Sequence, residues 1–162
     1  MMAVKYRGKA FSLSLILVFS CFTFISSDHT YFTECVSNEN DGYAVLKIWD
    51  AEQGKNYKYQ QARKDAVHAI LFSGVPPANS CITQKPIFTD SESQRNFEKI
   101  QSEFFSRNGA WSKYTRMAET QSTLPESIGK RNWKVYQVSV AKNLLRKDLE
   151  DQKIIKPLNS GF

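Results

Sequence analysis

Two segments alternate between apolar and polar residues with a period of two, and we expect both to be β-strands. They are residues 43–49 and 133–140. The side chains predicted to share an inner face are Ala44, Leu46 and Ile48 in the first and Tyr136, Val138 and Val140 in the second. Residues 111–120 alternate more loosely, and we expect a third strand there.

A helical period begins after the first strand and its polar loop. Residues 57–73 place Ala62, Ala66, Ala69 and Ile70 on one face, so we expect a helix that lies close against a sheet. Gly74 is positioned to end this helix, and the two prolines at 76 and 77 prevent its continuation.

Two further helices are predicted downstream. Asp90 and Ser91 form an N-terminal cap for the second helix, which ends at Asn108 and Gly109. Its apolar stripe consists of Phe97, Ile100, Phe104 and Phe105. The third helix is predicted to be capped by Asn143 and to carry Leu145 and Leu149, with Leu144 on its flank. Regular structure should stop by Pro157.

The predicted order is therefore strand, helix, helix, strand, strand, helix. This order indicates an α+β fold in which a small sheet of about three strands has about three helices packed on one side. We expect one domain over residues 43–162, because that length supports a single core. Residues 28–42 are polar and mixed, and we expect a lead-in that is ordered only if Cys35 holds it.

Residues 1–27 have the pattern of a secretory signal. Lys5, Arg7 and Lys9 precede an apolar run over residues 10–25, which is shorter than a membrane-spanning helix requires. We expect cleavage after Ser27 and a mature domain outside the cytoplasm. Lipid attachment at Cys21 is the alternative, because Ser20 supplies the small residue that precedes the cysteine of a lipoprotein signal.

Removing this leader changes the charge balance. Three of the 22 basic residues lie in it, which leaves 19 basic against 16 acidic residues and a net charge of +3. A mildly basic domain needs no polyanionic partner, so we expect no nucleic-acid partner. Membrane association is expected only through the alternative lipid anchor.

Cleavage also leaves two cysteines, Cys35 and Cys81. An oxidising compartment would allow them to form a disulfide, and we take them as a candidate pair. The sequence leaves open the alternative of two separate buried thiols.

Two stretches carry a resemblance to known proteins. Residues 62–76, the Tyr-Gln-Val-Ser-Val run at 136–140 and the tail from Leu149 resemble a group of exported bacterial proteins of uncharacterised function. More distantly, the Ala-Arg-x-x-Ala-x-x-Ala helix and the Tyr-x-Val-x-Val strand are similar to the N-terminal domain of flagellar assembly protein T and to flagellum-associated envelope lipoproteins. The resemblance implies an accessory role in the cell envelope without catalysis. The long second helix and the proline-containing insertion depart from that family, so a flagellar role does not carry over.

No catalytic motif is found in the sequence. A Gly-x-Ser-x-Gly elbow, a His-Glu-x-x-His zinc motif, a phosphate-binding loop and a calcium loop are all missing, so we predict no catalytic residue, no metal ligand and no cofactor. His68 and Cys81 form the thiol and imidazole combination available to a cysteine enzyme, but a bridged cysteine and a packed histidine are expected instead. Glu92, Glu98 and Glu103 are expected on the solvated side of the second helix.

One basic and aromatic cluster is a candidate binding site. Lys130, Arg131 and Trp133 combine cations with an indole ring, which anionic groups can exploit, although the same residues suit an ordinary turn before a strand.

Three functions remain after these steps. We expect an exported, non-enzymatic envelope domain that binds another envelope protein. A small secreted hydrolase of cell-wall or glycan material, which uses two carboxyl groups in a cleft, is the first alternative. A periplasmic small-ligand binder with an apolar cavity between helices and sheet is the second.

Overall fold

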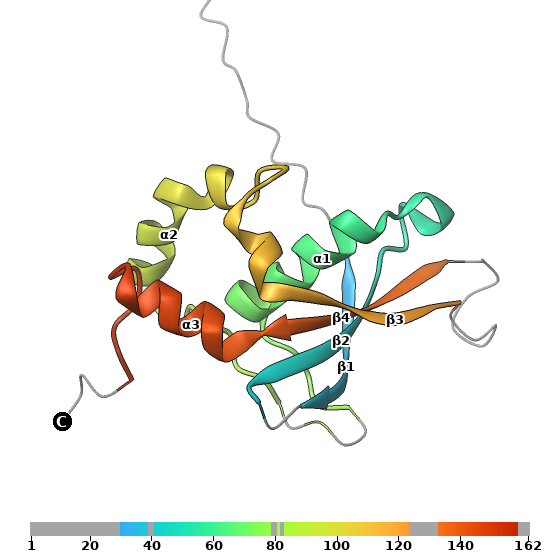
Figure 1. The fold of residues 1–162 in the computed structure, drawn as a ribbon, viewed down its shortest axis with the longest axis horizontal. Coiled ribbons are helices and arrows are strands. Elements are labelled where there is room, and N and C mark those ends of the chain that lie inside the picture. Colours follow the sequence, from blue (N-terminus) through green and yellow to red (C-terminus); the bar gives the residue numbers. More distant parts are fainter. Residues whose placement is uncertain (1–29, 39–40, 79–80, 82, 124–132, 159–162) are drawn as a thin grey trace, which may run out of the picture.

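The computed structural model describes residues 30–38, 41–78, 81, 83–123 and 133–158. One antiparallel sheet has the strand order β1-β2-β4-β3. Its strands are β1 (Phe32–Asn38), β2 (Tyr43–Trp49), β3 (Thr115–Thr123) and β4 (Lys134–Ala141). The helices are α1 (Tyr59–His68), α2 (Ser91–Phe104) and α3 (Lys142–Asp151), joined by the shorter η1 (Gly54–Asn56), η2 (Ala69–Ser73) and η3 (Ala110–Tyr114). The predicted α+β class is confirmed, with four strands where about three were expected (Figure 1).

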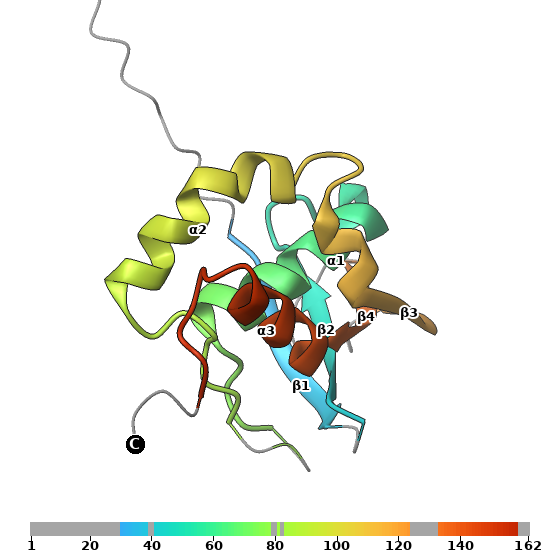
Figure 2. The same cartoon turned by 60° about the vertical axis from the view of Figure 1, so that its left-hand side comes forward.

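The centre of the sheet is the β2–β4 pair. Leu46 lies opposite Val138, and Ala44 lies opposite Val140, so the apolar faces of both strands coincide. These side chains are buried in the core, as their alternation predicted. The helices lie on this side of the sheet, with α1 directly against it and α2 farther out (Figures 1 and 2).

Strand β1 lies in the segment predicted to be a polar lead-in. It pairs with β2 and places Cys35 opposite Leu46, on the core side. Cys35 forms a disulfide with Cys81, with the two Cα atoms 6.0 Å apart. Residues 32–38 of the predicted lead-in therefore form an edge strand that carries the bridged cysteine. The disulfide also places Cys81 beside this edge strand.

Helix α1 begins two residues later than predicted and changes its hydrogen bonding before it ends. Its alanines are buried against the sheet. From Ala69 to Ser73 the chain forms a π-helical turn, which a period of 3.6 residues does not reveal. Gly74 ends the turn as predicted: its φ is 69°, and a Cβ there would come within 2.5 Å of the Gln84 carbonyl oxygen.

The second helix is capped as the sequence predicts. Asp90 accepts a hydrogen bond from the Ser93 backbone amide at 2.8 Å, and this bond lowers the pKa of the Asp90 carboxyl. Phe97 and Phe104 are buried, while Ile100 and Phe105 are partly buried against the same core. The stripe thus packs an aromatic cluster beneath α2.

Three further predicted boundaries are wrong. Helix α2 ends at Phe104 and not at Asn108 and Gly109. The strand expected over residues 111–120 begins at Thr115, because Trp111 and Tyr114 are both buried on the η3 turn. Asn143 does not cap α3: the cap position is Ala141, which still pairs with Tyr43 of β2. Strand β4 therefore continues into α3 without a connecting turn. Among the described residues, no helix has the length and apolar character needed to cross a bilayer.

Candidate functional site

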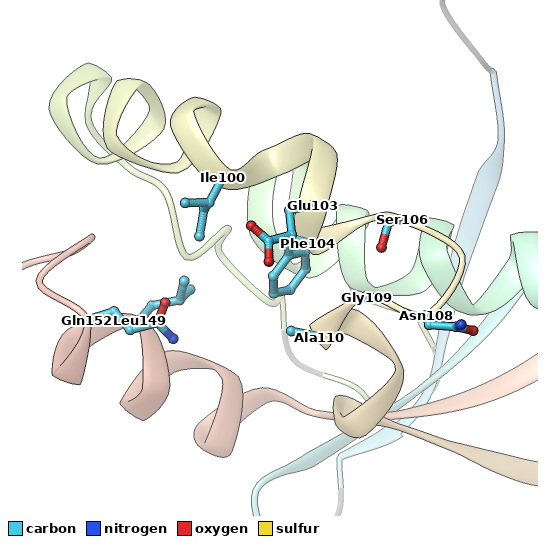
Figure 3. Close-up of a pocket in the computed structure, with 9 residues that line it drawn as sticks. All are labelled: Ile100, Glu103, Phe104, Ser106, Asn108, Gly109, Ala110, Leu149 and Gln152. Carbon is cyan, nitrogen blue, oxygen red and sulfur yellow. The ribbon is translucent and has the colours of Figure 1, made fainter.

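An open pocket of about 310 Å³ lies where α2, η3 and α3 meet. Figure 3 shows its side chains, which come from the end of α2, the following loop and the end of α3. They are Ile100, Glu103, Phe104, Ser106, Asn108, Gly109, Ala110, Leu149 and Gln152. The volume is at the small end of the range of about 300–1,000 Å³ that ligand pockets span.

The floor of the pocket is apolar. Phe104 and Leu149 are buried and Ile100 is half-buried, all in contact with the main core. The Phe104 ring is held by Phe97, Phe105 and Tyr114, whose ring centroids lie 5.0 to 6.0 Å from it. This floor is therefore a rigid part of the core.

The rim of the pocket is polar and exposed. It carries the Glu103 carboxylate and the side-chain amides of Asn108 and Gln152. Figure 3 shows Glu103 pointing into the space between α2 and α3. Its side chain has no hydrogen bond or ion pair with any described residue. None of the other residues that line this pocket is charged.

The loop under the pocket depends on a glycine. A Cβ at Gly109 would overlap the backbone carbonyl oxygens of Glu103 and Phe104. The Gly109 amide donates to the Ser106 carbonyl at 3.2 Å, and the Trp111 indole N–H donates to the same oxygen at 2.8 Å. The chain can therefore turn tightly from α2 into η3.

Hydrogen bonds and an ion pair from neighbouring elements hold the end of α2 and helix α3, which form the walls of the pocket. Lys64 of α1 donates to the Phe105 carbonyl at 2.6 Å, at the end of α2. The Tyr114 hydroxyl of η3 donates to Asp148 of α3 at 2.9 Å, and the Lys113 ammonium lies 2.7 Å from the same carboxylate oxygen. The lysine and the tyrosine both hydrogen-bond the ionised carboxyl, so the pKa of Asp148 is lowered.

A second cleft, of about 390 Å³, lies between the start of α2 and the end of α3. It is lined by three acids, each of which pairs with a base: Glu92 with Lys156, Glu150 with Arg146, and Asp151 with Lys147. The carboxylates of this cleft are therefore already engaged by basic side chains of the same chain.

The predicted site residues meet different outcomes. Cys35 and Cys81 form the disulfide described above. Cys21, Lys130 and Arg131 lie outside the described residues, so neither the lipid attachment nor the basic cluster is tested. Trp133 is half-buried, and its ring lies next to Gly54, where a Cβ would come within 3.3 Å of Trp133 Cδ1.

His68 is part of a packed polar cluster along α1. The Tyr31 hydroxyl lies 2.6 Å from His68 Nδ1, and burial raises the pKa of Tyr31 to about 12. The His68 ring packs on Phe72. Because Cys81 is bridged, it supplies no thiol for a cysteine mechanism with His68. Three residues earlier, Asp65 is buried and accepts a hydrogen bond from the Tyr57 hydroxyl at 2.5 Å.

No family model, no curated protein and no solved structure matches this chain. The resemblance to envelope accessory proteins therefore stays a prediction. Sequence reasoning did not identify the pocket, although its stripe residues Ile100 and Phe104 and the helix residue Leu149 were named separately. Glu103 was predicted to lie on the solvated side of the second helix, and its position next to this stripe was the signal that the sequence contained.

Proposed function

We propose that this chain is an exported, non-enzymatic domain of the cell envelope that binds another envelope protein. The Cys35–Cys81 disulfide supports the compartment, because such bonds persist where the surroundings are oxidising. The leader pattern of residues 1–27 points to the same compartment.

The pocket between α2 and α3 carries the binding part of the proposal. It joins a rigid apolar floor to a rim with one unpaired carboxylate and two amides, which is the composition of a recognition site. An open pocket of this size suits a single side chain of a partner better than an enclosed small molecule.

Site-specific photo-crosslinking in the native envelope tests the proposal. A photo-reactive amino acid replaces Ala110, which is exposed and lines the pocket, and the matched control replaces Glu98, which is exposed on α2 outside it. We expect a discrete adduct with one envelope protein from position 110 and none from position 98. If position 110 gives no adduct, or only the same background as position 98, the proposal is wrong.

A further inference from the structure

The charge of the pocket restricts what can enter it. Glu103 contributes a negative charge, and none of the other lining residues is basic. The acids on the neighbouring helix α3 are each paired, including Asp148 with Lys113. A cation that binds to Glu103 would therefore not have to break an existing ion pair.

The shape of the pocket restricts the cation further. The Phe104 ring supplies an aromatic surface over which a cation is attracted. The Glu103 carboxylate lies beside this ring and supplies hydrogen-bond acceptors, while Gln152 lies across the pocket at the end of α3. A planar guanidinium has five donors and an apolar face, so it uses both parts of the pocket, whereas an ammonium is a compact, strongly hydrated charge.

The chain itself already holds an arginine by the same chemistry. The Arg63 guanidinium lies 5.0 Å from the Trp111 ring centroid and 5.7 Å from that of Tyr59. It also donates to Thr115 Oγ1 at 2.8 Å and to the Ser112 carbonyl at 2.9 Å. Rings and oxygen acceptors thus form an arginine site elsewhere in this fold.

We propose that the pocket receives an arginine side chain of the partner protein, held by Glu103 over Phe104. This inference rests on the proposed function and names the chemistry of the contact. The arginine stem would lie on Ile100 and Leu149, and its guanidinium would meet the carboxylate at the rim.

A peptide titration followed by amide NMR tests the inference. The chain is expressed from Met1 and purified after export with its disulfide formed. The probes are acetyl-Gly-Arg-Gly-amide, its neutral citrulline analogue and the matching lysine peptide. We expect the arginine peptide to bind with a dissociation constant on the order of 1–10 mM and to shift the amides of Gly109 and Leu149. The citrulline peptide should bind at least about 5-fold more weakly.

Two matched variants complete the test. Glu103→Gln should lower the affinity for the arginine peptide by about 3- to 10-fold, and Glu98→Gln should leave this affinity unchanged. Equal binding of the citrulline or the matching lysine peptide, or equal effects of the two variants, would overturn the arginine assignment. Those results would not change the crosslinking of an envelope partner at position 110. The failure of this inference is therefore distinguishable from the failure of the proposed function.

Discussion

Removing the disulfide should lower the stability of this domain by a large and calculable amount. The perturbation is the double substitution Cys35→Ala and Cys81→Ala. The bond links residues 46 apart and holds the edge strand β1. In the chain-entropy model, opening a loop of this length lowers the free energy of unfolding by about 4 kcal/mol. For a domain of this size, that corresponds to a fall in Tm of roughly 10–20 °C.

Urea unfolding followed by tryptophan fluorescence measures the effect. The double variant should also show a larger denaturant dependence, because its unfolded chain is less compact than the crosslinked one. Hydrogen exchange should locate the loss of protection first in β1. Adding a reductant to the wild-type protein provides the control, since it should reproduce the variant's stability and leave the variant itself unchanged.

One result would refute this reasoning. If the double variant loses less than about 1 kcal/mol, and the wild-type protein does not respond to reductant, the bond does not constrain the unfolded chain. Strand β1 would then be held by its pairing with β2 alone.

Two further predictions concern hydrogen bonds to carboxylates. Tyr57→Phe removes the hydroxyl that donates to buried Asp65 and should lower the free energy of unfolding by about 1–3 kcal/mol. The control Tyr59→Phe, at a half-buried ring, should change it by less than about 0.5 kcal/mol. Urea unfolding of the two variants measures both changes. The hydrogen bond from Lys113 lowers the pKa of Asp148, so its stabilising contribution is complete above about pH 4 and is lost as the pH falls through the lowered value. The Tm difference between wild-type protein and Asp148→Asn should therefore shrink from pH 5 to pH 2, and a constant difference would contradict the assignment.

The parts of the fold that the sequence predicted are those with a strong local signal. Strand β2 and the core of β4 alternate cleanly, and Asp90 followed by an aromatic stripe identifies α2. Strand β1 reads Phe-Thr-Glu-Cys-Val-Ser-Asn, in which only the bridged Cys35 is fully buried. It is joined to Cys81, a residue far along the chain, by a bond that no local pattern contains.

The candidate site was less predictable for a similar reason. Ile100 and Phe104 were expected to face the core, and Glu103 was expected to face solvent, which matches its exposure. The pocket arises only because the end of α3 lies opposite the end of α2. That arrangement depends on the direct junction at Ala141, where sequence reasoning placed a cap at Asn143 instead.

That junction has a consequence for how the pocket responds to a ligand. One wall is continuous with β4 through Ala141, and the other is continuous with β3 through Tyr114 and Thr115. Because β3 and β4 are hydrogen-bonded neighbours, η3 and α3 cannot separate at these junctions unless one strand slides past the other and breaks ladder bonds. The η3 and α3 sides of the cavity are therefore preorganised, and an incoming side chain loses its own rotational freedom without having to order that part of the receptor.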